Sequence, residues 1–273
     1  MNFSDIKTAD QLLSFQKIKR HHFYHHFTNV SALNSILVGQ QWLLSPVTRM
    51  NDLHECTVKG DLQKWKRIVS TCFSFGDEDN MAMWAMYGLP WTQGVRITIP
   101  LRVMQQWYSE LQNPNWQNMN HVEYVSLHDM VYYDGYVDHD DSHLLWSRGK
   151  CRVMKDGDTD ISKSERFTGY IKNSAWKQEA ETRLMVVLKE DYVGNFFIPI
   201  PKSVLSNFEI CLGPMVDEER EQVLSKILRE VSSSKLRNAI SKNLQRCFFQ
   251  NKLHLKSMCD YCKNQFNSEN DYA

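Results

Sequence analysis

Short apolar runs, several of them alternating with polar residues, recur along the chain and predict a series of β-strands. The clearest is residues 182–188, which read Thr-Arg-Leu-Met-Val-Val-Leu. Residues 95–99 alternate as Val-Arg-Ile-Thr-Ile. Further strands are predicted over residues 23–28, 41–45, 70–75, 121–125, 195–200 and 208–212.

Helices are predicted where apolar residues recur at helical spacing. These segments are residues 5–18, 30–37, 55–69, 81–87, 101–111, 167–176, 216–231 and 236–249. Thr28 or Asn29 can cap the second of them, and Gly39 ends it. Residues 112–121 read as a polar loop. Strands mixed with helices and short loops favour an α+β fold, which we divide into a main domain, residues 1–232, and a helical C-terminal extension, residues 233–273.

The charge balance narrows the classes of partner. Thirty-two basic residues match thirty-two acidic ones, whereas proteins that grip nucleic acid along its phosphates usually carry a basic excess. Residues 1–7 lack the zones of a signal peptide, and no apolar run approaches the roughly 20 residues that span a bilayer. We therefore expect a cytoplasmic protein without a membrane partner.

The common nucleotide and hydrolase motifs are absent. The sequence has no glycine-rich dinucleotide fingerprint after a strand, no P-loop, no nucleophile elbow and no H-E-x-x-H. Five short pieces remain, each weakly informative alone. They are His26-Phe27-Thr28, Asn51-Asp52-Leu53-His54-Glu55, Cys72-Phe73-Ser74, Met83 to Tyr87 with Gly94, and Trp176 to Arg183.

The last piece places Glu179, Glu181 and Arg183 at spacings of two, at the start of a predicted strand. Period two puts the three side chains on one face, and two carboxylates this close repel unless one is protonated or paired. One interpretation is a surface strand end with Arg183 as an ion-pair partner. The other is a catalytic glutamate with a helper.

Two further pieces carry residue types that suit a ligand pocket. His26 is either a core or capping histidine or a ligand contact. The neighbouring histidines alternate along a strand and so point to opposite faces, which argues against a metal site there. Trp84 and Tyr87 share one helix face and are either core or an aromatic wall that stacks on a planar ring.

Taken together and in order, the five pieces resemble a bacterial domain family of uncharacterised proteins from toxin and phage-defence loci. Members of that family show H-Y-T, N-D-x-x-E, C-F-S, M-W-x-x-Y and W-x-x-E-x-E-x-R. Here Phe27 replaces the usual tyrosine, and Thr182 stands where an aromatic is common. The resemblance runs from about Tyr24 to Pro214 and implies a divergent ADP-ribosyltransferase fold with a split β-sheet core and flanking helices.

By this resemblance His26 contacts the nicotinamide ribose, Tyr87 stacks on nicotinamide, and Glu181 is the catalytic glutamate, with Glu179 as the second member of an E-x-E pair. The choice between the two glutamates stays open. The complete set of residues expected to bind NAD is His26, Thr28, Ser74, Trp84, Tyr87 and Arg183.

The implied activity is NAD-dependent transfer of ADP-ribose to a macromolecular acceptor, which is RNA, DNA or protein. NAD is then a substrate, the enzyme is a glycosyltransferase, and its setting is a bacterial toxin or anti-phage system with an antitoxin or chaperone partner. The alternatives are NAD hydrolysis without an acceptor, and a catalytically inert module that binds a nucleotide or a partner protein.

The C-terminal segment adds a separate metal hypothesis. Cys247, His254, Cys259 and Cys262 follow the pattern C-x6-H-x4-C-x2-C, which could supply four tetrahedral ligands for a structural zinc ion. Free thiols in a helical tail are the alternative.

Overall fold

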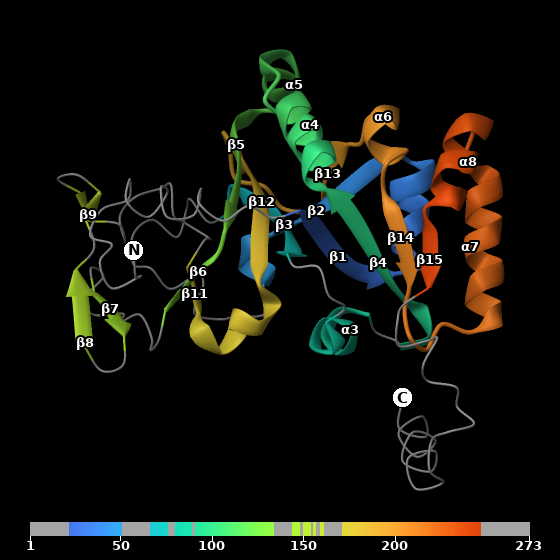
Figure 1. Cartoon of the computed structure of the whole chain (residues 1–273). Coiled ribbons are helices and arrows are strands. Elements are labelled where there is room, and N and C mark those ends of the chain that lie inside the picture. Colours follow the sequence, from blue (N-terminus) through green and yellow to red (C-terminus); the bar gives the residue numbers. More distant parts are fainter. Residues whose placement is uncertain are drawn as a thin grey trace, which may run out of the picture.

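An antiparallel sheet forms the centre of the protein. The computed structural model describes residues 22–50, 66–75, 80–88, 91–133, 144–147, 150–153, 155–156, 159–160 and 171–246. Along these residues strands and helices follow one another in an irregular order, and most of the strands form one mainly antiparallel sheet (Figure 1). The predicted α+β class with flanking helices is confirmed.

The main sheet has the strand order β13-β2-β3-β1-β4-β14-β15, and β12 joins it by pairing with β3 and β5. Every pairing within it is antiparallel except β14 with β15. The strands are β1 (Phe23–Asn29), β2 (Gln41–Pro46), β3 (Ile68–Phe75), β4 (Gly94–Pro100), β5 (Val122–Asp129), β12 (Glu181–Leu188), β13 (Phe196–Pro199), β14 (Glu209–Leu212) and β15 (Leu244–Arg246).

Strand β3 is where the sheet divides. One edge pairs with β12 along residues 68–74. The other edge meets β2 at Val69 and Ser70, then β1 at Ser74 and Phe75. Thr71, Cys72 and Phe73 lie between these two contacts, where β1 and β2 diverge. The backbone of β3 is therefore open to a pocket at its middle.

The helices lie around the sheet (Figure 1). They are η2 (Asn34–Val38, a π-helix), η3 (Val47–Arg49), α3 (Met81–Tyr87), η4 (Trp91–Gln93), α4 (Leu101–Leu111), α5 (Pro114–Met119), η7 (Ser174–Glu179), α6 (Lys202–Leu205), α7 (Glu218–Glu230) and α8 (Ser234–Lys242). The large core holds three aromatic side chains in mutual contact, Trp42, Trp107 and Phe208, with ring centroids 5.3–6.1 Å apart. No helix among the described residues is both long and apolar enough to cross a membrane.

Smaller strand pairs are formed by short strands between residues 131 and 173. β6 (Val131–Tyr133) pairs in parallel with β11 (Ile171–Asn173). β7 (Leu144–Ser147) pairs with β8 (Lys150–Val153), and β9 (Lys155–Asp156) with β10 (Thr159–Asp160). The helix expected over residues 167–176 is wrong for its described part, because residues 171–173 form a strand and residues 174–179 a 3-10 helix.

Three other expectations need correction. The helix expected over residues 55–69 is wrong at its end, because Ile68 and Val69 belong to β3. Residues 112–121 contain helix α5, which lacks an apolar stripe but begins with the Asn113 side chain accepting from Asn115 N and with Pro114 at its first position. The last predicted helix ends at Lys242, and Leu244–Arg246 pairs with β14 instead. Leu236 and Ile240 of α8 belong to the large core, and the domain boundary at residue 232 stays a prediction.

Three glycines allow the chain to pack against Trp84 of α3. A Cβ built on Gly213 would meet the carbonyl oxygen of Gly94 at 2.8 Å and Trp84 Cζ3 at 3.0 Å. A Cβ on Gly94 would meet the carbonyl oxygen of Gly88 at 3.0 Å. The Gly213 N–H also donates to the Gly94 carbonyl at 2.8 Å. These contacts fix α3 against the end of β4.

Substituting Gly213 with alanine tests this packing. The methyl group would press on backbone that cannot withdraw, so we expect the free energy of unfolding to fall by about 1–3 kcal/mol. Chemical denaturation measures the change. Val193→Ala, at a side chain that is 92% exposed, is the control and should change the free energy of unfolding by less than about 0.5 kcal/mol. Equal effects of the two substitutions would contradict the packing described.

Candidate functional site

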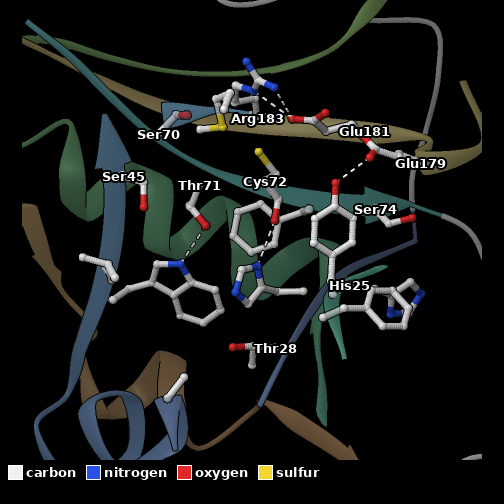
Figure 2. Close-up of a pocket in the computed structure, with 18 of the residues that line it drawn as sticks. His25, Thr28, Ser45, Ser70, Thr71, Cys72, Ser74, Glu179, Glu181 and Arg183 are labelled. Atoms are coloured by element: carbon white, nitrogen blue, oxygen red, sulfur yellow. Dashed lines mark hydrogen bonds and ion pairs between the residues drawn. The ribbon is translucent and has the colours of Figure 1, made fainter. Parts of the chain in front are cut away.

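A cavity of about 530 Å³ opens at the division of the sheet, within the size range of small-molecule sites. Its walls come from β1, η2, β2, η3, β3, α3, β11, η7, β12 and β13. Figure 2 labels lining residues of β1, β2, β3, η7 and β12. The sequence-predicted site residues that line it are His26, Thr28, Ser74, Tyr87, Glu179, Glu181 and Arg183. Segments far apart in the sequence therefore meet at one pocket.

Glu181 is the first residue of β12 and is 3% exposed. Its Oε1 accepts from Arg183 Nε at 2.8 Å and lies 2.7 Å from Arg183 Nη2. Its Oε2 accepts from Lys172 Nζ at 2.9 Å, and the Cys72 thiol also donates to this carboxylate. Figure 2 shows the Arg183 contact. Glu181 thus sits among donors on three sides.

Glu179 ends η7 and is 2% exposed. Its Oε1 accepts from the Tyr87 hydroxyl at 2.5 Å, and its Oε2 accepts from Lys172 Nζ at 2.6 Å. Both contacts are donors, which suits an ionised carboxylate. The alternative of a surface strand end is wrong, because both glutamates are buried.

The expectation that both glutamates lie on one strand face is also wrong. Glu179 precedes the strand, and Ala180 between them has a φ of +44°, in the left-handed region that non-glycine residues seldom adopt. Ala180 also connects to β3, since the Phe75 N–H donates to its carbonyl at 2.9 Å. This reversal turns Glu179 toward the same Lys172 that contacts Glu181.

The charges around the two carboxylates affect them differently. Burial opposes ionisation of Glu181, but Arg183 and then Lys172 outweigh burial and hold its pKa at about 2. Burial raises the pKa of Glu179, with Lys172 and the Tyr87 hydroxyl opposing that rise and the Glu181 charge adding to it. The two glutamates are therefore electrostatically distinct, and Glu181 is the one held more firmly as an anion.

The surroundings of His26 determine its tautomer. Its Nδ1 lies 2.9 Å from the Cys72 carbonyl, which only accepts, so Nδ1 carries the proton. Burial lowers its pKa, and that carbonyl only partly offsets the effect, so the ring is neutral at pH 7. The ring packs 4.8 Å from Trp42, whose Nε1 donates to Thr71 Oγ1. The unprotonated Nε2 of this cavity-lining histidine can accept a hydrogen bond from a ligand hydroxyl.

Helix α3 delivers Tyr87 to the cavity. The helix begins at Asn80, whose side chain accepts from the N–H groups of Ala82 and Met83 and donates to the Gln178 carbonyl at 3.0 Å. One residue thus ties α3 to η7 beside Glu179. Burial and the bond to Glu179 raise the pKa of the Tyr87 phenol, so it remains a donor at neutral pH.

The remaining sequence-predicted site residues divide into two groups. Thr28 on β1 and Ser74 on β3 line the cavity, and Ser74 lies opposite Glu181 in the strand register. Trp84 does not line it: the side chain is buried behind the wall, with its ring 4.9 Å from Phe27 in an edge-to-face contact. Trp84 supports the wall that Tyr87 forms.

Two sequence motifs fall outside the described residues. One is the segment from Asn51 to Glu55. The other is the proposed zinc set, Cys247, His254, Cys259 and Cys262, so structural zinc stays a prediction. Within the described ranges no group of three or more His, Cys, Asp or Glu side chains could hold a metal ion.

Comparisons with known proteins yield a distant structural likeness. No protein-family model matches the sequence, and no curated protein matches it. The fold is similar to that of DarT from Thermus sp. 2.9 in complex with NAD+, with a TM-score of 0.38 and 10% identity over 85% of this chain and 98% of that one. A second structure of that protein, in complex with carba-NAD+, has a TM-score of 0.36 and 8% identity over 85% of this chain and 97% of that one. At these scores the chemistry must be argued from this chain's own side chains.

Sequence reasoning missed Lys172. It lies in a stretch without a motif, on a segment expected to be helical, and no periodicity marks it. An isolated lysine between an apolar residue and Asn173 gives no signal of burial, since lysine is almost always exposed. Only the tertiary contacts with Glu179 and Glu181 distinguish it.

Proposed function

We propose that this protein is an NAD-dependent ADP-ribosyltransferase that modifies a macromolecule. The observation that carries the proposal is the convergence of His26, Tyr87, Glu179 and Glu181 on one cavity. These residues come from four separate elements, and they are the residues to which the sequence resemblance gives roles. Their meeting at one pocket of suitable size supports the proposal.

The proposed chemistry suits an ionised, buried carboxylate. The bond between nicotinamide and ribose C1′ breaks with its electron pair leaving on nicotinamide, and positive charge develops on the ribose. A fixed negative charge nearby stabilises that oxocarbenium-like state. Glu181, with its pKa held at about 2, provides this charge at any physiological pH.

The other cavity residues have distinct proposed roles. Tyr87 presents its ring as a wall for the nicotinamide, and its hydroxyl fixes Glu179. His26 accepts from a ribose hydroxyl through Nε2. Glu179 takes the proton that the acceptor loses when its nucleophile bonds to C1′. Its pKa, raised relative to an ordinary glutamate, suits it to this task better than that of Glu181.

The acceptor and the biological setting belong to the same proposal. A macromolecular acceptor, RNA, DNA or protein, would approach the mouth of the cavity. If the protein is a bacterial toxin or an anti-phage effector, its expression should harm a host cell, and an antitoxin or chaperone would hold it in check. NAD hydrolysis without an acceptor is the competing enzymatic outcome.

Incubation of the purified protein with NAD labelled in the ADP-ribose moiety and a bacterial lysate tests the proposal. We expect label to move to nuclease-sensitive or protease-sensitive material, with nicotinamide released in equal amount. If free ADP-ribose is the sole labelled product, the activity is NAD hydrolysis and not transfer. Absence of nicotinamide release would exclude both activities and leave a binding module.

A further inference from the structure

Lys172 is an unusual lysine because its charged end is buried. The residue lies on β11, a strand that pairs with β6 and not with the main sheet, and it is 4% exposed. Its Nζ donates to Glu179 Oε2 at 2.6 Å and to Glu181 Oε2 at 2.9 Å. It also lies 5.0 Å from the centroid of the Trp176 ring. Burying an ammonium group is costly unless it is paired, so the contacts with Glu179 and Glu181 are what allow Lys172 to be buried.

The charges in this cluster balance only when Lys172 is counted. Glu179 and Glu181 supply two negative charges, and Lys172 and Arg183 supply two positive ones. Two polar neighbours on α3 and β3, Tyr87 and Cys72, are neutral donors whose pKa values burial raises. On β5, His128 lies opposite Arg183 in the strand register. Arg183 contacts Glu181, whereas Lys172 contacts both carboxylates.

We propose that Lys172 is a positioning residue for the transfer reaction, bridging Glu179 and Glu181 so that both stay ionised and both face the cavity. This inference rests on the proposed function and adds a residue to it. Two buried carboxylates without a shared cation would repel, and one would take up a proton. Because Glu181 would still have Arg183, the protonated one would be Glu179, and the base for the acceptor would be lost.

The substitution Lys172→Met keeps an unbranched side chain, one atom shorter, and removes its charge. Without the ammonium, the pKa of Glu179 should rise, so a limb of the pH profile that requires ionised Glu179 should move to higher pH. We expect the acid limb of kcat/KM to move upward by about 1–3 pH units, and kcat/KM at pH 7 to fall about 100-fold. Lys172→Arg retains the cation and should restore the acid limb toward its original pH. Lys177→Met, which alters an exposed lysine of η7, is the matched control and should leave the profile unchanged.

A second measurement does not depend on turnover. Infrared spectroscopy of the Lys172→Met protein at pH 7 without NAD should show the C=O band of a protonated carboxyl that the unaltered protein lacks. Adding Glu179→Gln should abolish that band. If Lys172→Met does not fold, the double variant with Glu179→Gln, which removes one charge of each sign, replaces it. In that case, folding of the double variant supports the bridge, because removing the partner charge then compensates for the loss of Lys172, and failure of the double variant to fold contradicts it.

An unshifted acid limb together with no protonated carboxyl would overturn the role of Lys172. If the unaltered protein releases no nicotinamide, the proposed function is wrong. The infrared result still decides independently whether Lys172 keeps Glu179 ionised.

Discussion

The Glu181→Gln protein is expected to release nicotinamide about 10³-fold more slowly than the unaltered protein, because the fixed charge facing the developing oxocarbenium is lost. The amide keeps the shape of the side chain, and its carbonyl can still accept from Arg183 (2.8 Å in the unaltered protein). Its NH2 group would face Lys172, donor against donor, so a loss of stability accompanies the substitution. The amount of free nicotinamide formed from NAD over time measures the rate, and thermal unfolding confirms that the variant is folded at the assay temperature.

Three comparisons separate a catalytic role from a structural one. Glu181→Asp restores the charge one methylene farther from the cavity and should recover part of the rate. Glu190→Gln, at an exposed position just beyond β12, should behave as the unaltered protein. Glu179→Gln should impair transfer to an acceptor more than release of nicotinamide. Turnover by folded Glu181→Gln within tenfold of the unaltered rate would contradict the assignment of the catalytic glutamate.

Removing the guanidinium of Arg183 is expected to lower the free energy of unfolding by about 3–5 kcal/mol, the usual effect of breaking a buried ion pair from one side. Arg183 is 0% exposed on a strand paired along both edges. In Arg183→Met the Glu181 carboxylate would keep Lys172 but lose both contacts of its Oε1. Denaturant titration measures the difference.

The matched control is Arg229→Met on the exposed face of α7, which should change the free energy of unfolding by less than about 0.5 kcal/mol. Combining Arg183→Met with Glu181→Gln should recover part of the loss, since no unpaired charge then remains. The buried ion pair also makes the stability of the unaltered protein depend on pH through Glu181. Its pKa is held at about 2 in the folded state and is about 4 in an unfolded chain. Its stabilisation is therefore present above about pH 4 and is lost as the pH falls toward 2. Equal effects of Arg183→Met and Arg229→Met would contradict the account of the buried pair.

The local sequence pattern correctly predicted those helices and strands whose signals lie within the segment itself. Helix α4 begins and ends at Leu101 and Leu111 as expected, because Pro100 and the apolar spacing act within the segment itself. The run of apolar residues in 182–188 likewise predicts β12. The sequence offered Thr28 or Asn29 as the cap of the helical turn before η2. In the structure the Asn29 side chain is the cap, and it accepts from Ala32 N.

Elements that depend on distant partners were missed. Residues Leu244–Arg246 continue a helical pattern, and only pairing with β14 makes them a strand. Tertiary pairing overrides propensity at such positions. The left-handed turn at Ala180 has no glycine to announce it, so the relative directions of Glu179 and Glu181 could not be read from their spacing. The family resemblance identified most of the residues that line the pocket. It did not identify Lys172, which contacts both carboxylates.

The insertion of β12 between β3 and β5 has a consequence for the timing of activity. Tyr87 and Glu179 are 92 positions apart, and both strands that pair with the strand carrying Glu181 precede it in the sequence. Contacts of such long sequence separation form late in folding. A ribosome that stops before residue 179 therefore releases a chain with the histidine and the tyrosine but neither carboxylate. Under the proposed function, an interrupted synthesis therefore yields a fragment that lacks the proposed catalytic glutamate.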